Sequence, residues 1–369
     1  MDFTYSDDQV ALRDLAARIL GERGADDDPR DGAYDAAAWR ALAETGLLGL
    51  AIGTRWGGLG LGMIDFGLLL EEQGRTLARV PLIPSIVMGA MTIDRFGSDA
   101  QRRHYLPGAL AGEMLLTAAI EEEGNADPAR PATRAWRTGD RWVLSGTKTA
   151  VPYAAKAGAM LVSAQGETDA MLFLVDAAIA PAPEPQWATN GEPQGRFHFA
   201  ETALPAAALL GEGSPDALPD LIARARIALA QRQVGVAAEA LRRTAEYSSS
   251  RIQFGRPTGS MQAVQQRAAD GFIDVEAMRS AALLAAWRYD QGMCGAAEAA
   301  SAKYWAATGG HRVAHTAQHL HGGIGADISY PIHRYFLEAM AVGHALGGGM
   351  PMLAEIGRAI AEGRTEALA

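Results

Sequence analysis

Three residues of different chemistry stand close together between residues 251 and 270. Arg251 is a fixed cation, Phe254 is a flat apolar ring and Gln262 is an amide, and residues 255–259 between them read as a turn. A guanidinium presents forked donors that match a pyrophosphate, and an aromatic ring beside it suits adenine or another flat group. This combination predicts a nucleotide contact. An ordinary helix–turn–helix corner with a solvated arginine would contain the same residues.

Two helices are needed to position these residues. The run before Arg251 has helical periodicity, and a second helix is predicted to begin at Ser260, whose hydroxyl can cap it by accepting a backbone N–H. From about residue 216 onward the chain is rich in alanine and helical in pattern. Four long amphipathic helices with short connections predict an antiparallel bundle.

The rest of the chain divides into two further regions by its pattern of apolar and polar residues. Residues 6 to about 115 have helical periodicity, whereas residues 116–213 contain short alternating segments broken by glycine, proline and asparagine, which indicate strands. We therefore expect a mainly α fold with one β domain. Its parts would be an N-terminal α-helical domain (1–115), a middle antiparallel β domain (116–213) and a C-terminal four-helix bundle (214–369).

Composition limits the classes of function. The 369 residues are 49% hydrophobic and 21% charged, which suits a folded chain of two or three domains. A net charge of -10 without a basic cluster argues against nucleic-acid binding. The single cysteine, Cys294, excludes a disulfide framework and a cysteine-based metal site, and we expect it to be a small buried apolar residue. Neither a signal peptide nor a membrane-spanning run is recognisable, so we expect a soluble cytoplasmic protein without a membrane partner.

The stretch that starts at Arg251 resembles the R-x-x-F-G-(K/R)-x-x-x-x-x-Q signature of the acyl-CoA dehydrogenase family. A W-G-G-x-G loop at residues 56–60 and the order of the domains extend this resemblance along the chain. Members of the family use FAD to oxidise acyl-CoA thioesters between the α and β carbons, and electron-transfer flavoprotein is their usual electron acceptor. In the family, the Arg, Phe and Gln of the signature reach across a subunit interface to hold a neighbour's FAD. The resemblance therefore implies that Arg251, Phe254 and Gln262 bind FAD.

A second group of cofactor residues is implied by the segment HLHGGIG at residues 319–325. It resembles the family's glycine pair, which lets the backbone approach the pyrophosphate of FAD, and so assigns cofactor contacts to His319, Gly322 and Gly323. His319 replaces the glutamine that is usual in the family. A helix C-cap would also explain paired glycines at this position.

The catalytic base of the family has no counterpart in this sequence. The Y-P-x-x-R element is intact at residues 330–334, but Leu346 stands where the Glu of the following Y-E-G-T motif belongs. Some members carry the Glu just before an arginine of the first bundle helix, and that position here is Ala225. Neither leucine nor alanine can remove the α proton of a thioester.

Three other residues are candidate substitutes for the base. Glu338 and His344 lie near the missing motif, and Glu246 precedes the Arg251 turn. His344 can titrate near neutrality. A packed or solvated position on a helix explains each of the three equally.

The residues that would bind this chain's own flavin also depart from the family pattern. The T-E-P-x-A-G-S-D loop corresponds to residues 120–127, where Ile120 and Ala126 replace the two hydroxyl residues and two extra acids appear. The K-x-W-I-T segment corresponds to residues 148–152, which keep Lys148 but lose the tryptophan and the threonine. Extra negative charge beside a pyrophosphate is unfavourable. We expect this pocket to be empty of flavin.

These departures are asymmetric, because residues that act on a neighbour's cofactor are kept and those that act on the chain's own are lost. The resemblance implies an oxidoreductase subunit that shares an interface FAD with a related chain carrying the Glu. Bacterial α2β2 acyl-CoA dehydrogenases that shorten steroid side chains as CoA thioesters are built in this way. Two alternatives stay open: a self-sufficient homo-oligomeric acyl-CoA dehydrogenase with an unusual base, and a non-catalytic scaffold that binds acyl-CoA.

Overall fold

The structure is a computed structural model that describes residues 4–21, 34–293 and 295–363. Two compact units are present. Unit 1 comprises Met1–Asp28, Met63–Ala78 and Arg226–Ala369, and unit 2 comprises Pro29–Gly62 and Arg79–Ala225. The three-part division at residues 115 and 213 stays a prediction. Cys294, which was expected to be buried, lies outside the described residues.

Two helices of unit 2 begin at side chains that cap them. Asp35 accepts hydrogen bonds from two backbone N–H groups at the start of α2 (Ala36–Glu44). Ser98 and Gln101 form a reciprocal capping box at the start of α5 (Asp99–Leu110). The other helical elements of this unit are η2 (Leu47–Gly49), η3 (Thr54–Trp56), η4 (Leu82–Ala90), α4 (Met91–Phe96) and η5 (Ala206–Ala208).

The strands of unit 2 form one mixed sheet. They are β1 (Leu116–Ala119), β2 (Arg134–Thr138), β3 (Arg141–Pro152), β4 (Ala159–Gln165), β5 (Ala170–Asp176), β6 (Glu184–Trp187) and β7 (Pro193–Pro205). Their order is β1-β4-β2-β3-β7-β6, and β5 also pairs with β4. Most neighbours are antiparallel, as expected, but β1 runs parallel to β4, and β2 meets β4 in parallel at its end. Residues 120–158 supply the long crossover that a parallel pair requires. Phe173, Phe197 and Phe199 lie in the buried core of this sheet.

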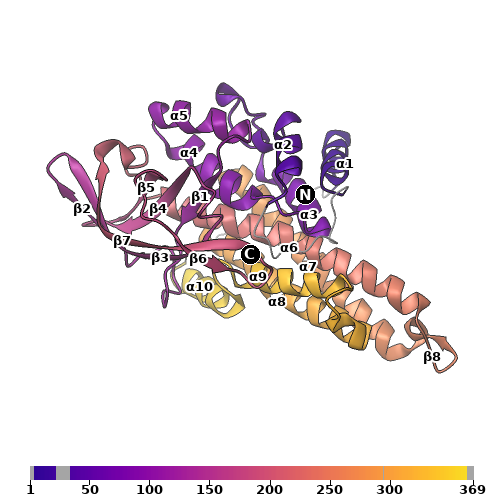
Figure 1. Cartoon of the computed structure of the whole chain (residues 1–369). Coiled ribbons are helices and arrows are strands. Elements are labelled where there is room, and N and C mark those ends of the chain that lie inside the picture. Colours follow the sequence, from indigo (N-terminus) through magenta and orange to yellow (C-terminus); the bar gives the residue numbers. More distant parts are fainter. Residues whose placement is uncertain (1–3, 22–33, 294, 364–369) are drawn as a thin grey trace. The chain divides into compact units, whose positions relative to one another are not determined.

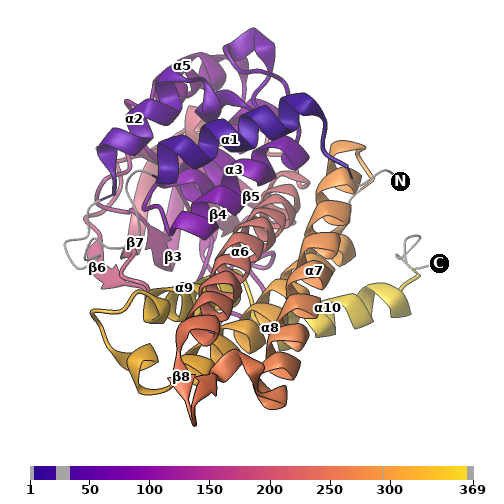
Figure 2. The same cartoon turned by 90° about the vertical axis from the view of Figure 1, so that its right-hand side faces the viewer.

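Long helices make up most of unit 1, as the alanine-rich pattern predicts. α6 (Ala217–Ser250) enters this unit at Arg226, and α7 (Gln262–Asp290) and α8 (Ala296–His321) follow it (Figures 1 and 2). The other helices are α1 (Asp7–Gly21), α3 (Met63–Thr76), α9 (Ile332–His344) and α10 (Gly349–Ala361). The predicted fold class, mainly α with a β domain, is confirmed. None of the described helices is long and apolar enough to cross a membrane.

Glycines bring α3 and α6 into close contact. A Cβ added at Gly235 of α6 would lie 1.9 Å from the carbonyl oxygen of Glu71 in α3, and one at Gly74 would lie 2.1 Å from the carbonyl oxygen of Arg232. Real Cβ atoms do not approach so closely, so only glycine permits this packing.

Candidate functional site

The predicted turn after Arg251 is a β-hairpin at one end of the bundle of unit 1 (Figure 2). β8 (Ile252–Gln253) pairs with β9 (Arg256–Pro257) directly after α6. Phe254 and Gly255 form the tip with φ values of 51° and 74°. Positive φ at both central residues is what a two-residue type I′ turn requires.

The three signature residues all face solvent. Arg251 and Gln262 are exposed, and Phe254 is 93% exposed. Within the described part of the chain, Arg251 and Gln262 have no side-chain hydrogen-bond or ion-pair partner. The hairpin therefore presents a guanidinium and a ring, and the first residue of α7 presents an amide, to whatever molecule lies outside.

Ser260 does not cap α7, contrary to the sequence prediction. A short 3₁₀ helix, η6 (Thr258–Ser260), lies between the hairpin and α7, and the N-cap residue is Met261. The hydroxyl of Ser260 donates to the carbonyl of Pro257 at 2.7 Å. Ser260 is the last residue of this 3₁₀ helix and lies one residue before the N-cap position, where its hydroxyl binds Pro257 and not an N–H group of α7.

The predicted residues of α8 lie at the end of that helix. His319 is exposed, and its Nδ1 accepts a hydrogen bond from Nη1 of Arg267 at 2.9 Å. Gly322 is the C-cap of α8 with φ 66° and ψ -141°, a conformation that favours glycine. A Cβ added at Gly322 or Gly323 would meet nothing within 4 Å. The cap explains Gly322, and the open space beside both glycines leaves room for a close approach by a ligand.

In residues 120–127, Glu122 is a buried structural carboxylate. Its Oε1 accepts from Nζ of Lys148 at 2.7 Å, and it also accepts from the backbone N–H and the hydroxyl of Thr133. Burial by itself would raise the pKa of Glu122, but the Lys148 ammonium and the Thr133 hydrogen bonds lower it to about 2. The second extra acid, Glu123, pairs with Arg196 at 3.0 Å. Protein groups thus already neutralise both extra charges.

The polar groups around this loop are also bound within the chain. The side-chain amide of Asn125 donates to Glu122 and to the carbonyl of Arg130, and its oxygen accepts from the N–H of Asp127. In β3, the N–H of Ala150 donates to the side-chain oxygen of Gln186 at 2.9 Å. The side-chain donors of Asn125 and the N–H groups of Asp127 and Ala150 are therefore already bound within the chain.

The turn between α9 and α10 contains Leu346, which is buried and has a φ of 54°. Nε of Arg226 donates to its carbonyl at 3.2 Å, and Nη1 of the same arginine binds Glu355. The buried ammonium of Lys303 donates to the carbonyls of Gly343 and Gly347 at 2.7 and 3.0 Å. Buried cations hold this turn, and position 346 supplies no carboxylate.

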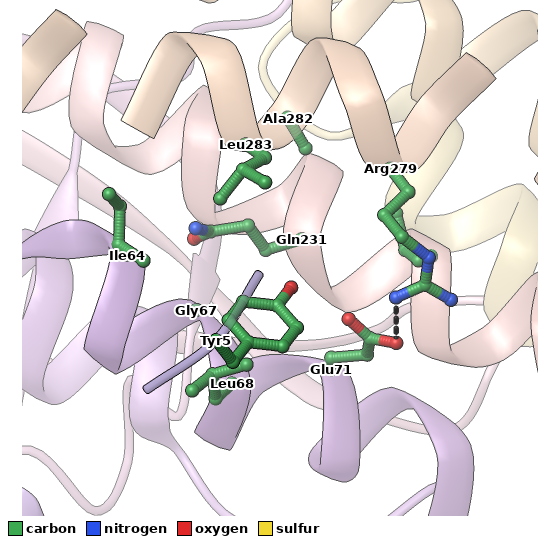
Figure 3. Close-up of a pocket in the computed structure, with 10 residues that line it drawn as sticks. Tyr5, Ile64, Gly67, Leu68, Glu71, Gln231, Arg279, Ala282 and Leu283 are labelled. Carbon is green, nitrogen blue, oxygen red and sulfur yellow. Dashed lines mark hydrogen bonds and ion pairs between the residues drawn. The ribbon is translucent and has the colours of Figure 1, made fainter. Parts of the chain in front are cut away.

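One small cavity lies between α3, α6 and α7 (Figure 3). Its volume is about 20 Å³, which is room for about one water molecule. Gln231 lines it with a side-chain oxygen that has no partner within the described chain, and Tyr5 and the ion pair between Glu71 and Arg279 lie beside it. Ligand sites for groups such as a flavin are typically ~300 to 1,000 Å³. This cavity therefore holds neither the cofactor nor an acyl chain.

Comparison with known proteins decides the family. Residues 6–113 match the model of the acyl-CoA dehydrogenase N-terminal domain, and residues 211–361 match that of the C-terminal domain. The chain is 36% identical to the acyl-CoA dehydrogenase FadE27 of Mycobacterium tuberculosis, over 98% of this chain and 99% of that protein. It belongs to the acyl-CoA dehydrogenase family.

Two solved structures of this family are similar over nearly the whole chain. One is the ChsE4-ChsE5 complex from Mycobacterium tuberculosis, with 36% identity, full coverage of both chains and a TM-score of 0.91. The other is the Tcur3481-Tcur3483 steroid acyl-CoA dehydrogenase, with 42% identity, coverage of 98% and 99%, and a TM-score of 0.90. Acyl-CoA dehydrogenases are oxidoreductases, and this chain has their fold from end to end.

The substitute bases considered for this acyl-CoA dehydrogenase occupy different environments. Glu338 is buried and forms an ion pair with Arg232 at 2.6 Å. Glu246 is exposed and pairs with Arg242. His344 is exposed at the end of α9. Both glutamates are thus engaged in ion pairs within the chain.

Two features of this acyl-CoA dehydrogenase were missed at the sequence level. The Glu122–Lys148 pair joins positions 26 residues apart, and Arg267 meets His319 across 52 positions. Lys148 stood out as a retained residue, but nothing in the local pattern signals its partner. The position of Arg267 on the same helix as Gln262, a predicted cofactor contact, was the only signal in the sequence that could have drawn attention to Arg267.

Proposed function

We propose that this chain is one subunit of a heteromeric, FAD-dependent acyl-CoA dehydrogenase. It would share each cofactor with a related chain in an α2β2 assembly, and that partner would supply the catalytic glutamate. The observation that carries the proposal is Phe254, a ring that is 93% exposed on a backbone with positive φ.

In the isolated chain, the conformation and the exposure of Phe254 both cost free energy. A residue with a Cβ in the left-handed region costs about 1–2 kcal/mol relative to the usual conformations. Leaving a phenylalanine ring in water also forgoes roughly 1.5–3 kcal/mol of burial free energy. No described residue compensates either cost, so we infer that a molecule outside the chain covers the ring.

The exposed residues at this end of the bundle fit an FAD. Arg251 offers forked donors for the diphosphate, Phe254 offers a flat face, and the open backbone at Gly322 and Gly323 admits a close contact. When bound, FAD would accept the hydride that leaves the β carbon of the acyl group. The role of this chain is to bind and orient the cofactor. It cannot supply the base at the two usual positions, because the side chains of Leu346 and Ala225 cannot accept a proton.

The relatives support a proposal for the substrate class. One similar structure is described as a steroid acyl-CoA dehydrogenase and the other as a complex of two named chains. We therefore propose an acyl-CoA thioester with a steroid side chain as the substrate. Electron-transfer flavoprotein as acceptor, a cytoplasmic location and domain boundaries at residues 115 and 213 belong to the same proposal.

Cofactor content tests the proposal. The chain would be expressed alone and together with acyl-CoA dehydrogenase chains from the same genome, and the visible spectrum and FAD content of each purified product would be measured. We expect a colourless chain alone and a yellow complex with one of the partners, from which Arg251→Ala removes FAD. Stoichiometric FAD on the isolated chain would contradict the proposal and favour the self-sufficient enzyme. A stable complex without FAD would favour the scaffold.

A further inference from the structure

Arginine side chains connect α7 with α8 at several levels, and Arg288 of α7 pairs with Glu298 of α8 at the end away from the hairpin. Two further contacts lie nearer the hairpin. Arg312 of α8 binds Asp274 of α7, with Nε donating to Oδ2 at 2.8 Å. Arg267 of α7 donates to Nδ1 of His319 in α8 at 2.9 Å. The two helices are antiparallel, since moving seven residues back along α7 corresponds to moving seven residues forward along α8. The Arg267 contact therefore lies about two turns nearer the hairpin end of the bundle.

The two contacts differ in charge. Asp274 neutralises Arg312, whereas a neutral imidazole leaves the charge of Arg267 uncompensated. A guanidinium has no acceptor, so Nδ1 of His319 accepts and the neutral ring carries its hydrogen on Nε2. Arg267 forms no ion pair with any residue that the structure describes. The contact fixes the direction of the guanidinium without cancelling its charge.

Uncompensated cations gather at this end of the bundle. Arg251 and Arg256 are exposed on the hairpin and, like Arg267, have no ion-pair partner in the described ranges. This concentration occurs in a chain whose net charge is -10. By contrast, arginines further along the same helices pair with carboxylates, as Arg279 does with Glu71. Guanidinium groups without counter-charges at one end of a helix bundle attract an anion with several oxygens.

We propose that Arg267, oriented by His319, is a further cofactor-binding residue of this surface and serves the diphosphate of the shared FAD. The inference rests on the proposed function. His319 stands three positions before Gly322, and the space beside Gly322 and Gly323 is open. A phosphate that approaches this backbone would lie beside the helix end that His319 and Arg267 share.

Variants of the co-purified complex test the inference. Arg267→Met removes the charge but keeps the length of the side chain, Arg267→Lys keeps the charge, and Arg312→Met removes the neighbouring ion pair between α7 and α8. FAD would be stripped and titrated back to obtain its Kd, and the melting temperature of the stripped complex would be measured in parallel. We expect Arg267→Met to raise the Kd for FAD about tenfold and Arg267→Lys to raise it less. Arg312→Met should lower the melting temperature and leave the Kd unchanged.

Arg251→Ala separates failure of the inference from failure of the proposed function. If Arg251→Ala weakens FAD binding and Arg267→Met does not, Arg267 is a structural contact and the inference is wrong while the proposed function stands. If neither variant changes the Kd, the proposed function is wrong as well. Loss of subunit association with an unchanged Kd would show that Arg267 meets a carboxylate of the partner chain, which also overturns the inference.

Discussion

Phe254 occupies a backbone conformation that glycine and asparagine adopt at lower cost. Its ring makes no contribution to the core of the chain because it is 93% exposed. Stability and function should therefore respond in opposite directions to a change at this position.

We predict that Phe254→Asn leaves the free energy of unfolding of the isolated chain unchanged or raises it by up to about 1 kcal/mol. FAD retention by the complex should fall in the same variant. Urea unfolding and flavin absorbance would measure the two effects. Ile179→Asn, at an exposed apolar residue of unit 2, is the control and should leave FAD content unchanged. A clearly destabilised isolated chain would count against this account of Phe254.

Glu122 and Lys148 provide a second test at the scale of residues. Removing one partner of a buried ion pair leaves the other uncompensated, so Glu122→Gln should lower the free energy of unfolding by about 3 kcal/mol at neutral pH. The double variant with Lys148→Met should recover part of that loss. Urea titrations of the three proteins would measure both.

The same pair predicts a dependence on pH. The folded pKa of Glu122 is lowered from 4.5 to about 2, so its contribution to stability is complete above about pH 4.5 and is lost as the pH falls toward 2. The difference between wild type and Glu122→Gln should therefore shrink between pH 5 and pH 3. A difference that stays constant over this range would contradict the ion-pair account.

Restoring a carboxylate at position 346 tests whether the missing base is the only feature that would keep the isolated chain from catalysing dehydrogenation. We expect Leu346→Glu to give no dehydrogenase activity in the isolated chain, because Ile120 and Ala126 replace the hydroxyl residues of the family's flavin loop and the two extra acids of the loop are paired within the chain. It should also destabilise the fold by about 1–3 kcal/mol, since position 346 is buried and Arg226 already pairs with Glu355. Leu346→Gln is the uncharged control. Turnover of an acyl-CoA by isolated Leu346→Glu, measured with an artificial electron acceptor, would refute this prediction.

At the scale of elements, the close packing of α3 against α6 in unit 1 depends on glycine. Gly235→Ala would place a methyl group 1.9 Å from a carbonyl oxygen of α3, so α3 and α6 would have to move apart. We predict a loss of about 1–3 kcal/mol in the free energy of unfolding. The same change at Gly357, an exposed position of α10 with nothing within 4 Å, should stabilise by about 0.5–1 kcal/mol. Equal effects at the two sites in thermal or urea unfolding would show that the close approach does not matter.

At the scale of the whole molecule, exposed apolar residues accompany the proposed cofactor-contact residues. Ile252 and Phe254 of the hairpin and Phe272 and Ile273 of α7 are each more than half exposed. Exposed apolar side chains of this size are frequent on association surfaces. We predict that the co-purified complex contains two copies of each chain, as light scattering coupled to gel filtration would measure. Replacing Phe272 and Ile273 with serine should reduce assembly, whereas a complex with one copy of each chain would contradict the α2β2 arrangement.

Residue type and spacing were enough to predict part of this protein. Helical periodicity with an alanine-rich pattern predicted the long helices of unit 1, and alternation predicted the sheet of unit 2. The signature at Arg251, Phe254 and Gln262 indicated the family, because a motif depends only on residues close together in sequence. Local patterns failed where neighbours decide the outcome, as in the parallel pairing of β1 with β4 and the use of Ser260 before α7 begins.

By itself the sequence determined the family, the mainly α fold with its β domain, and the lack of a carboxylate at positions 346 and 225. Each of these depends on which residue stands where. Only the tertiary structure decided that Phe254 projects into solvent with positive φ, that Lys148 neutralises Glu122, and that Arg267 meets His319. Exposure and pairing between distant residues are set by how helices and strands pack, and local periodicity does not encode that packing.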